Sequence, residues 1–335
     1  MKQTRREFVR TLFAASQGIL AGSLLPVNLF AEAASSSANP LNFVIFGDWG
    51  REGELDQIQV ATQMAKTADT IGAKFVISVG DNFYEDGVAS TGDPQWRKSF
   101  EDVYHAPSLQ VPWQVILGNH DYRGNCEAQL AYGTLSPRWN MPARYFKLSK
   151  PLDATTTADF FFLDTTPMIA EYYWEPKTRP HVKAQDVPQQ LAWFENALAA
   201  STARWKIVIG HHPIYSGGKH GDTPDLVKKV LPLLHKYQVP IYFNGHDHDL
   251  QHLMTGDINL VCTGAGSKVR DTVDTANTKF AKAIPGFVAV SLQPDKMDLH
   301  MIDNSGTMLY ATTVLPNAPK TAGRSKSASR TGITI

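Results

Sequence analysis

The chain has 335 residues, 43% of them hydrophobic, which is enough for one large core or two smaller ones. Lysine and arginine together number 32, as do aspartate and glutamate, so the net charge gives no reason to expect nucleic acid as a partner. The two cysteines, Cys126 and Cys262, are too few for a disulfide scaffold, and both a single bridge and two unpaired thiols stay open.

The first 33 residues have the layout of a signal peptide with a twin-arginine motif. Arg5 and Arg6 precede a weakly hydrophobic run over residues 11–30, and Ala33 completes a small-residue cleavage motif. The alternative is a retained membrane anchor, but polar residues, glycine and proline interrupt the run. We therefore predict a signal peptide over residues 1–33 and transient contact with the bacterial twin-arginine export machinery. The processed protein is expected to be periplasmic or secreted, with no stable membrane span.

After the signal peptide, residues 34–40 are predicted to be a linker, residues 41–315 one domain, and residues 316–335 a flexible tail. Short apolar strands are predicted within the domain at 42–46, 75–79, 113–117, 160–163, 206–209, 241–243 and 259–262. Amphipathic helices are predicted between several of them, at 55–68, 189–200 and 225–236. This alternation predicts an α/β fold. Three later strands, at 286–292, 297–302 and 308–314, follow one another without helices, so part of the sheet should be antiparallel.

Polar turns that begin with glycine follow five of these strands. They are Gly47-Asp48-Trp49-Gly50, Gly80-Asp81-Asn82-Phe83-Tyr84, Gly118-Asn119-His120-Asp121, Gly210-His211-His212-Pro213 and Gly245-His246-Asp247-His248. Ligands in open α/β sheets collect at the carboxyl ends of the strands, where all these turns lie. His246 and His248 are two residues apart and would face the same side of an extended chain. His212 and Asp247 are expected to point away from the site.

The side chains in these turns sort into two chemical sets of metal ligands. A hard, anionic set suited to a trivalent ion comprises Asp48, Asp81, Tyr84 and His248. A neutral set suited to a divalent ion comprises Asn119, His211 and His246. Because a carboxylate has two oxygens, Asp81 can bridge the two ions.

The turns resemble the metallophosphoesterase pattern, and within it the purple (tartrate-resistant type) acid phosphatases, over residues 41–253. In the broad superfamily the first turn is Asp-x-His and the second is Gly-Asp-x-x-Asp. Here Gly50 stands in place of that histidine and Tyr84 in place of the second aspartate. This paired departure marks the purple branch, in which tyrosinate binds iron(III). A phenol with a pKa near 10 is a poor ligand for zinc, whereas a trivalent ion can hold it deprotonated.

The resemblance implies a sandwich of two mixed β-sheets flanked by helices. It implies Fe(III) on the first ligand set and Fe(II), Zn(II) or Mn(II) on the second, with Asp81 shared. The implied reaction is the hydrolysis of small phosphate monoesters by a metal-bound hydroxide. His120 and His220 match two non-ligand histidines that face the substrate, and the segment 169–187 matches a loop that restricts access in some relatives.

Several alternatives stay open. His120 could hydrogen-bond to Asp121 without a catalytic role, and His220 could belong to a flexible loop. The same metals could serve a phosphodiesterase or nucleotidase, and an iron pair could carry out peroxidative chemistry. A hypothesis from a different functional class is a secreted binding or iron-handling protein with a vestigial site. A missing ligand would favour that hypothesis.

Overall fold

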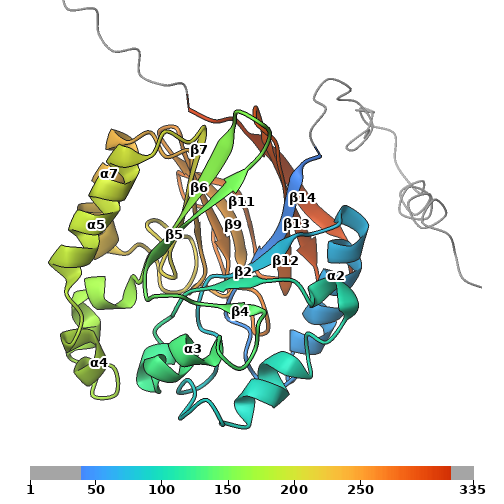
Figure 1. Ribbon diagram of the computed structural model, residues 1–335, viewed down its shortest axis with the longest axis vertical. Coiled ribbons are helices and arrows are strands. Elements are labelled where there is room, and N and C mark those ends of the chain that lie inside the picture. The colour runs from blue at the N-terminus through green and yellow to red at the C-terminus, as the bar shows by residue number, and fades with distance from the viewer. Residues whose placement is uncertain (1–38, 318–335) are drawn as a thin grey trace, which may run out of the picture. The chain divides into compact units, whose positions relative to one another are not determined.

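The structure, a computed structural model, describes residues 39–317, which form two mixed β-sheets with helices on their outer sides (Figure 1). The predicted signal peptide lies outside the described residues, as do most of the predicted linker and tail. Over the described stretch, no helix combines the length and the apolar character that crossing a membrane requires.

The first sheet has seven strands and contributes three of the polar turns. Its order is β14 (Met308–Val314), β13 (Met297–Asp303), β12 (Gly286–Leu292), β1 (Leu41–Phe46), β2 (Phe75–Ser78), β3 (Trp113–Val115) and β4 (Trp139–Asn140). Strands β1 to β4 run parallel, so their carboxyl ends lie at one edge. Strands β12, β13 and β14 pair antiparallel, as their succession without helices predicts.

The second sheet also has seven strands and contributes the other two turns. Its order is β11 (Thr278–Lys282), β9 (Leu250–Thr255), β10 (Ile258–Thr263), β8 (Ile241–Asn244), β7 (Trp205–Ile209), β6 (Thr157–Phe162) and β5 (Phe146–Pro151). Strands β6, β7, β8 and β10 run parallel, while β5, β9 and β11 pair antiparallel with their neighbours.

The core between the sheets follows from the alternation of side chains along each strand. In β1, Phe43 and Ile45 belong to the cluster between the two sheets, and Val44 and Phe46 belong to the cluster under the helices. Both faces of β1 are therefore buried, which is why its sequence is an unbroken apolar run. Burying one such side chain contributes about 1.5–3 kcal/mol.

Helices cover the outer face of each sheet. Helix α2 (Gln57–Ile71) packs Val60 and Met64 toward the first sheet, and α5 (Val187–Ala200) packs Phe194 and Leu198 toward the second. Figure 1 shows α2 on one side of the molecule and α5 and α7 on the other.

The helix predicted at 225–236 is instead two helices, α6 (Pro224–Lys229) and α7 (Leu231–Lys236). Pro232 explains the break, because proline has no N–H and is tolerated only in a first turn. The remaining helices and helical turns are α3 (Cys126–Tyr132), α4 (Arg179–Lys183), η1 (Trp96–Glu101), η2 (Pro107–Leu109), η3 (Asp121–Arg123), η4 (Thr166–Met168) and η5 (Ala170–Tyr173).

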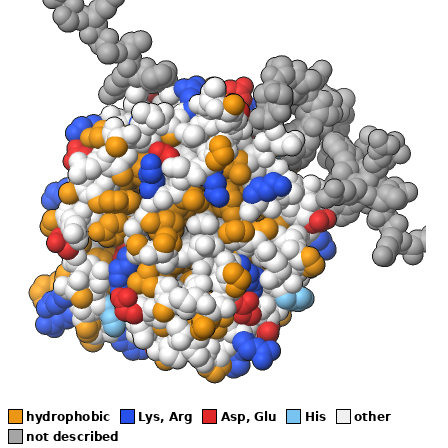
Figure 2. All heavy atoms as spheres, in the orientation of Figure 1, with side chains coloured by type: hydrophobic (Ala, Val, Ile, Leu, Met, Phe, Trp, Pro, Cys, Tyr) orange, Lys and Arg blue, Asp and Glu red, His pale blue; other side chains and the backbone are white. Residues whose placement is uncertain are grey.

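The fold class expected from the resemblance is confirmed: the molecule is an α/β sandwich of two mixed sheets flanked by helices. The question left open for Cys126 and Cys262 is also answered, since both are buried free thiols. On the face seen in Figure 2, lysine and arginine side chains are scattered among acidic and apolar ones rather than gathered in one basic patch.

Candidate metal centre

The five polar turns meet at the carboxyl ends of their strands. Every candidate oxygen ligand comes from the first sheet, through the turns after β1, β2 and β3, and every candidate imidazole comes from the second, through the turns after β7 and β8. Backbone hydrogen bonds join neighbouring turns: the Asp48 amide donates to the Gly80 carbonyl at 3.0 Å, and the Gly245 amide to the His211 carbonyl at 2.9 Å. Between the sheets, the His246 amide donates to the Asp48 carboxylate at 3.0 Å, so the ends of the two sheets form one site.

The backbone of these turns is sharply bent where side chains enter the site. Asp48, Asp81 and His246 have φ values of 60°, 49° and 69°, in the left-handed region that costs a non-glycine residue about 1 kcal/mol or more. Two glycines make room for the carboxylates, since a Cβ at Gly118 would overlap Asp81 and one at Gly245 would overlap Asp48. The chain accepts this strain where it brings the candidate ligands together.

Four of the candidate donor atoms, the Tyr84 hydroxyl oxygen among them, lie close together. The hydroxyl oxygen is 3.0 Å from Asp48 Oδ1, 3.0 Å from Asp81 Oδ2 and 3.1 Å from His248 Nε2. A phenol has one proton and cannot satisfy three such neighbours at once. Ligands at right angles around an ion at about 2.1 Å are themselves about 3 Å apart, so these separations fit one hard cation.

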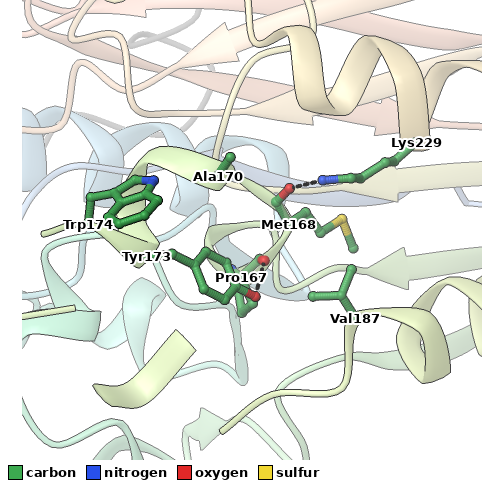
Figure 3. Close-up of a pocket in the computed structure, with 7 residues that line it drawn as sticks. All are labelled: Pro167, Met168, Ala170, Tyr173, Trp174, Val187 and Lys229. Carbon is green, nitrogen blue, oxygen red and sulfur yellow. Dashed lines mark hydrogen bonds between the residues drawn. The ribbon is translucent and has the colours of Figure 1, made fainter. Parts of the chain in front are cut away.

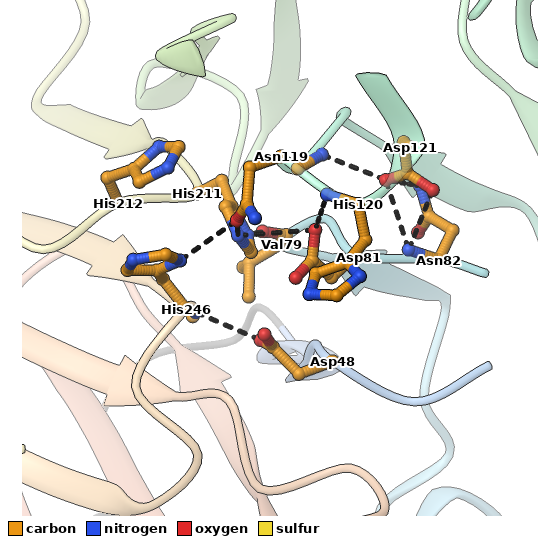
Figure 4. Close-up of polar contacts among 12 residues, drawn as sticks. Asp48, Val79, Asp81, Asn82, Asn119, His120, Asp121, His211, His212 and His246 are labelled. Atoms are coloured by element: carbon orange, nitrogen blue, oxygen red, sulfur yellow. Dashed lines mark hydrogen bonds and ion pairs between the residues drawn. The ribbon is translucent and has the colours of Figure 1, made fainter. Parts of the chain in front are cut away.

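A second group of donors surrounds the Asn119 side-chain oxygen. It lies 3.2 Å from His211 Nε2 and 3.0 Å from His246 Nδ1 (Figure 4). The Asp81 carboxylate extends to both groups, because its Oδ1 is 3.5 Å from His211 Nε2 while its Oδ2 faces Tyr84. The predicted sets therefore lie as two groups of donors that share Asp81, which fits a pair of ions.

Electrostatics in the ion-free protein point to the same need for cations. Burial alone would raise the pKa of Asp81, but the charges of His211 and His120 outweigh it and lower that pKa well below its usual range. Burial, followed by the charges of Asp48 and Asp81, raises the pKa of Tyr84 well above its usual value. The phenol can therefore become a ligand only beside a strongly charged cation.

His211 is oriented for metal binding by its second ring nitrogen. Nδ1–H donates to the Val79 carbonyl at 2.9 Å, which leaves Nε2 as the nitrogen that faces the donors (Figure 4). Burial would lower the pKa of His211, but the Asp81 carboxylate raises it to about 9.

His212 lies beside the site without a free nitrogen. A ring nitrogen of His212 lies within 4.8 Å of those of His211 and His246, as in a three-histidine metal site. However, its Nδ1 is 2.8 Å from Thr165 Oγ1 and its Nε2 is 2.8 Å from the Tyr172 hydroxyl. Burial and the charge of His211 lower its pKa well below the usual value. His212 is thus a neutral, hydrogen-bonded neighbour of the site, and its ring lies beside those of His211 and His246 rather than on the opposite face.

The turn after β8 differs from its predicted geometry. His246 and His248 were expected to face one side of an extended chain, but residues 246–249 form bends and His246 is left-handed. Each histidine consequently reaches a different donor group. Asp247 between them faces away, where its carboxylate accepts hydrogen bonds from the Ser216 hydroxyl and the His220 amide.

Asp121 holds two of the turns together. Its buried carboxylate accepts hydrogen bonds from the backbone amides of Gly118, Asn82 and Phe83 and from the side chains of Asn82 and Gln129 (Figure 4). Burial, then the charge of Asp81, raises its pKa to about 7, and these donors oppose the shift. Because these bonds occupy Asp121, His120 does not bond to it; the His120 ring contacts Glu85 and Arg123 instead.

A pocket of about 280 Å³ opens onto the donors. Its walls include four candidate ligands, both candidate catalytic histidines and two arginines, Arg123 and Arg270. Nδ1 of His120 lies 2.5 Å from the Glu85 carbonyl, and Nε2 of His220 lies 2.5 Å from Arg270 Nη1. Burial and the Arg270 charge lower the pKa of His220, against the opposing effect of Asp247.

The sequence did not indicate three arginines that surround the centre. The Arg51 guanidinium lies 3.7 Å from the centre of the Tyr84 ring, while Arg123 and Arg270 line the pocket. Arg51 and Arg123 stand within four residues of predicted ligands, so nearness in sequence was an available signal. Arg270 is 22 residues beyond His248 and carried no such signal.

The segment predicted to restrict access contacts the rim of the centre at two points. The Tyr172 hydroxyl bonds to His212, and Glu175 accepts from Arg123 at 2.8 Å. This segment also borders a separate pocket of about 330 Å³ whose walls include Tyr173, Trp174 and Val187 (Figure 3). No candidate ligand lines that pocket, so the 280 Å³ pocket is the one that adjoins the candidate metal centre.

Comparisons with known proteins agree with this geometry. The profile of the calcineurin-like phosphoesterase family matches residues 41–250. The chain is 39% identical over 300 residues to purple acid phosphatase 17 of Arabidopsis thaliana, covering 84% of this chain and 86% of that protein. It is 36% identical over 293 residues to tartrate-resistant acid phosphatase type 5 of Sus scrofa, covering 81% and 86%.

Solved structures share the fold. A protein described as GAP50, the anchor in the inner membrane complex of Plasmodium, superposes with a TM-score of 0.75 at 25% identity, covering 84% of this chain and 90% of that one. The purple acid phosphatase PPD1 of yellow lupin (Lupinus luteus) seeds superposes with a TM-score of 0.62 at 17% identity, covering 83% and 54%. At that identity the second likeness concerns the fold alone.

Proposed function

Because this chain belongs to the calcineurin-like phosphoesterases and, within them, to the purple acid phosphatases, we propose that it hydrolyses phosphate monoesters with two metal ions. The observation that carries the proposal is the pair of donor groups that share the Asp81 carboxylate. All seven ligands expected from the family resemblance are present in the two donor groups, and four of them line one pocket, which speaks against a vestigial site. The small pocket suits small phosphate esters.

We propose that the first ion is Fe(III) and the second is Fe(II), Zn(II) or Mn(II). The anionic group of Asp48, Asp81, Tyr84 and His248 suits a trivalent ion, and the group of Asp81, Asn119, His211 and His246 suits a divalent one. When bound, the two ions would supply the nucleophile by lowering the pKa of a water molecule and would draw charge from the phosphoryl oxygens.

The reaction forms one bond from the water oxygen to phosphorus and breaks the bond from phosphorus to the ester oxygen, which leaves with a proton as the alcohol. We propose that His120 and His220, on the pocket wall, bind the phosphoryl group and provide that proton. The Glu85 carbonyl contacts Nδ1 of His120, so we assign the substrate contact to Nε2, which lies 3.5 Å from Arg123 Nη1. The Asp247 carboxylate holds the backbone of His220 in place at 2.8 Å.

The direct test combines metal analysis with an assay of two ester classes. Mass spectrometry of the purified protein should give about one iron and one further metal ion per chain. p-Nitrophenyl phosphate should be hydrolysed faster than bis(p-nitrophenyl) phosphate across the acid pH range. Faster hydrolysis of the diester would instead establish a phosphodiesterase on the same metals, and two zinc ions would refute the iron assignment.

We also propose that the protein is exported in folded form by the twin-arginine route to the periplasm or the medium. The support lies in the sequence of residues 1–33, where Arg5 and Arg6 precede a weakly hydrophobic run. A site that needs two different ions gains from being loaded in the cytoplasm, where metal supply is controlled.

A further inference from the structure

Arg270 reaches the pocket from the loop that follows β10. Its backbone amide donates to the His248 carbonyl at 2.9 Å, which anchors this loop to the candidate ligand turn. Its side chain lines the same pocket as Asp81, Asn119 and the two candidate catalytic histidines. The guanidinium is therefore fixed at the wall of the reaction site.

The other two arginines around the centre form ion pairs with carboxylates, whereas Arg270 forms none within the described part of the chain. Arg51 pairs with Glu85 at 2.7 Å, and Arg123 pairs with Glu175 at 2.8 Å. Within residues 39–317, no carboxylate lies within the 4.0 Å of the Arg270 guanidinium that defines an ion pair. The one side-chain hydrogen bond of Arg270 within these residues is with His220, and a neutral imidazole accepts a hydrogen bond without cancelling the charge.

We propose that Arg270 binds a second anionic group on the substrate, such as the inner phosphate of a nucleoside diphosphate, while the terminal phosphate lies at the metal centre. The inference rests on the proposed function. A guanidinium presents a planar fork of donors that matches phosphate oxygens. Two arginines line the pocket, and the charge of Arg123 is paired with Glu175, so Arg270 is the one that offers an uncompensated charge to a second anionic group.

The test compares two substrates that differ by one phosphate, adenosine 5′-monophosphate and adenosine 5′-diphosphate. In Arg270→Gln, kcat/KM for the diphosphate should fall about tenfold more than kcat/KM for the monophosphate, mostly through KM, because a charge-assisted hydrogen bond is lost. Arg270→Lys should restore part of the difference. Lys268→Gln removes the same charge from the same loop outside the pocket and should leave the ratio of the two substrates unchanged.

Three results would overturn the inference. An equal loss on both substrates would mean that Arg270 only positions His220. Equal effects of Lys268→Gln and Arg270→Gln would reduce the role to the general charge of the loop. A wild type that hydrolyses the monophosphate but not the diphosphate would exclude the second site. Failure of the wild type on both substrates and on p-nitrophenyl phosphate would refute the proposed function instead. The metal content of each variant is measured in parallel, so that a loss of activity caused by loss of the metal ions can be recognised.

Discussion

Tyr84 is the residue that most restricts the choice of metal. Its hydroxyl has three candidate ligands as neighbours, and its ring lies under the Arg51 guanidinium, with Arg51 itself only 10% exposed. Burial and two carboxylates oppose its ionisation. A tyrosinate here therefore implies a trivalent partner, and that pairing has a visible consequence.

We expect the purified protein to be pink to purple, because tyrosinate on Fe(III) gives a charge-transfer band in the visible range. Tyr84→Phe should abolish the band and keep the fold, since the ring that packs under Arg51 remains. Tyr104→Phe, which removes another buried hydroxyl that bonds to Gln57 and to none of the candidate ligands, is the control and should leave the colour intact. Visible absorption and iron content decide the matter. A colourless iron-loaded wild type, or a coloured Tyr84→Phe, would contradict the assignment.

His211 and His220 stand nine residues apart and are expected to differ in kind. His211→Ala removes a nitrogen from the second donor group and should lose the divalent ion. His220→Ala should keep both ions and the colour while lowering turnover by about 10²-fold, the usual contribution of a general acid. Metal analysis and kcat for the two variants provide the measurement. Equal metal loss in both would show that His220 belongs among the ligands.

At the scale of elements, the turns after β2 and β3 depend on Asp121, whose carboxylate accepts bonds from both. Asp121→Asn keeps the size of the side chain but replaces one acceptor by a donor facing buried N–H groups. The free energy of unfolding should fall by about 2–4 kcal/mol. Urea denaturation measures it. Asp102→Asn, which breaks the exposed pair with Arg97, should cost no more than about 1 kcal/mol. A similar loss of unfolding free energy in both variants would show that Asp121 has no special role in holding the two turns together.

Elements that combine an apolar run with a polar turn could be predicted from the sequence. β1, β2, β7 and β8 all begin and end within two residues of the prediction. The strands β5, β9 and β11 were missed because they lack this signal. β5 alternates with lysines and ends in Pro151, as an edge strand can, and β9 contains Gln251 and His252, which are buried by tertiary packing rather than by their own hydrophobicity.

The residues of the site also differ in how far the sequence predicts them. Residues that follow a strand directly were predictable, because the carboxyl ends of parallel strands share an edge. The supporting residues were not: Thr165 and Tyr172, which orient His212, are 47 and 40 residues from it, and Glu175 is 52 residues from Arg123. Such pairs depend on how η4 and η5 fold back over the sheet, and no local pattern encodes that.

At the scale of the whole molecule, export and metal loading should be linked. Arg5 and Arg6, which lie outside the described residues, are the expected recognition pair of the twin-arginine route. Changing both to lysine should trap folded, active, metal-loaded enzyme in the cytoplasm. Activity in periplasmic and cytoplasmic fractions measures this. If the two arginines merely supply positive charge to an ordinary signal, lysine would serve as well and export would continue.

The division of ligands between the sheets has a mechanical consequence. Since the candidate oxygen ligands belong to one sheet and the imidazoles to the other, a metal ion bound in either donor group would hold the two sheets together. An ion that binds only the folded protein stabilises it by about 2.7 kcal/mol when the free ion concentration is a hundred times the dissociation constant. Stripping them with a chelator should lower the melting temperature, and amide exchange should speed up first at the ends of β1, β2, β7 and β8. The supply of metal where the chain folds would then govern how much of it survives, not only how fast it works.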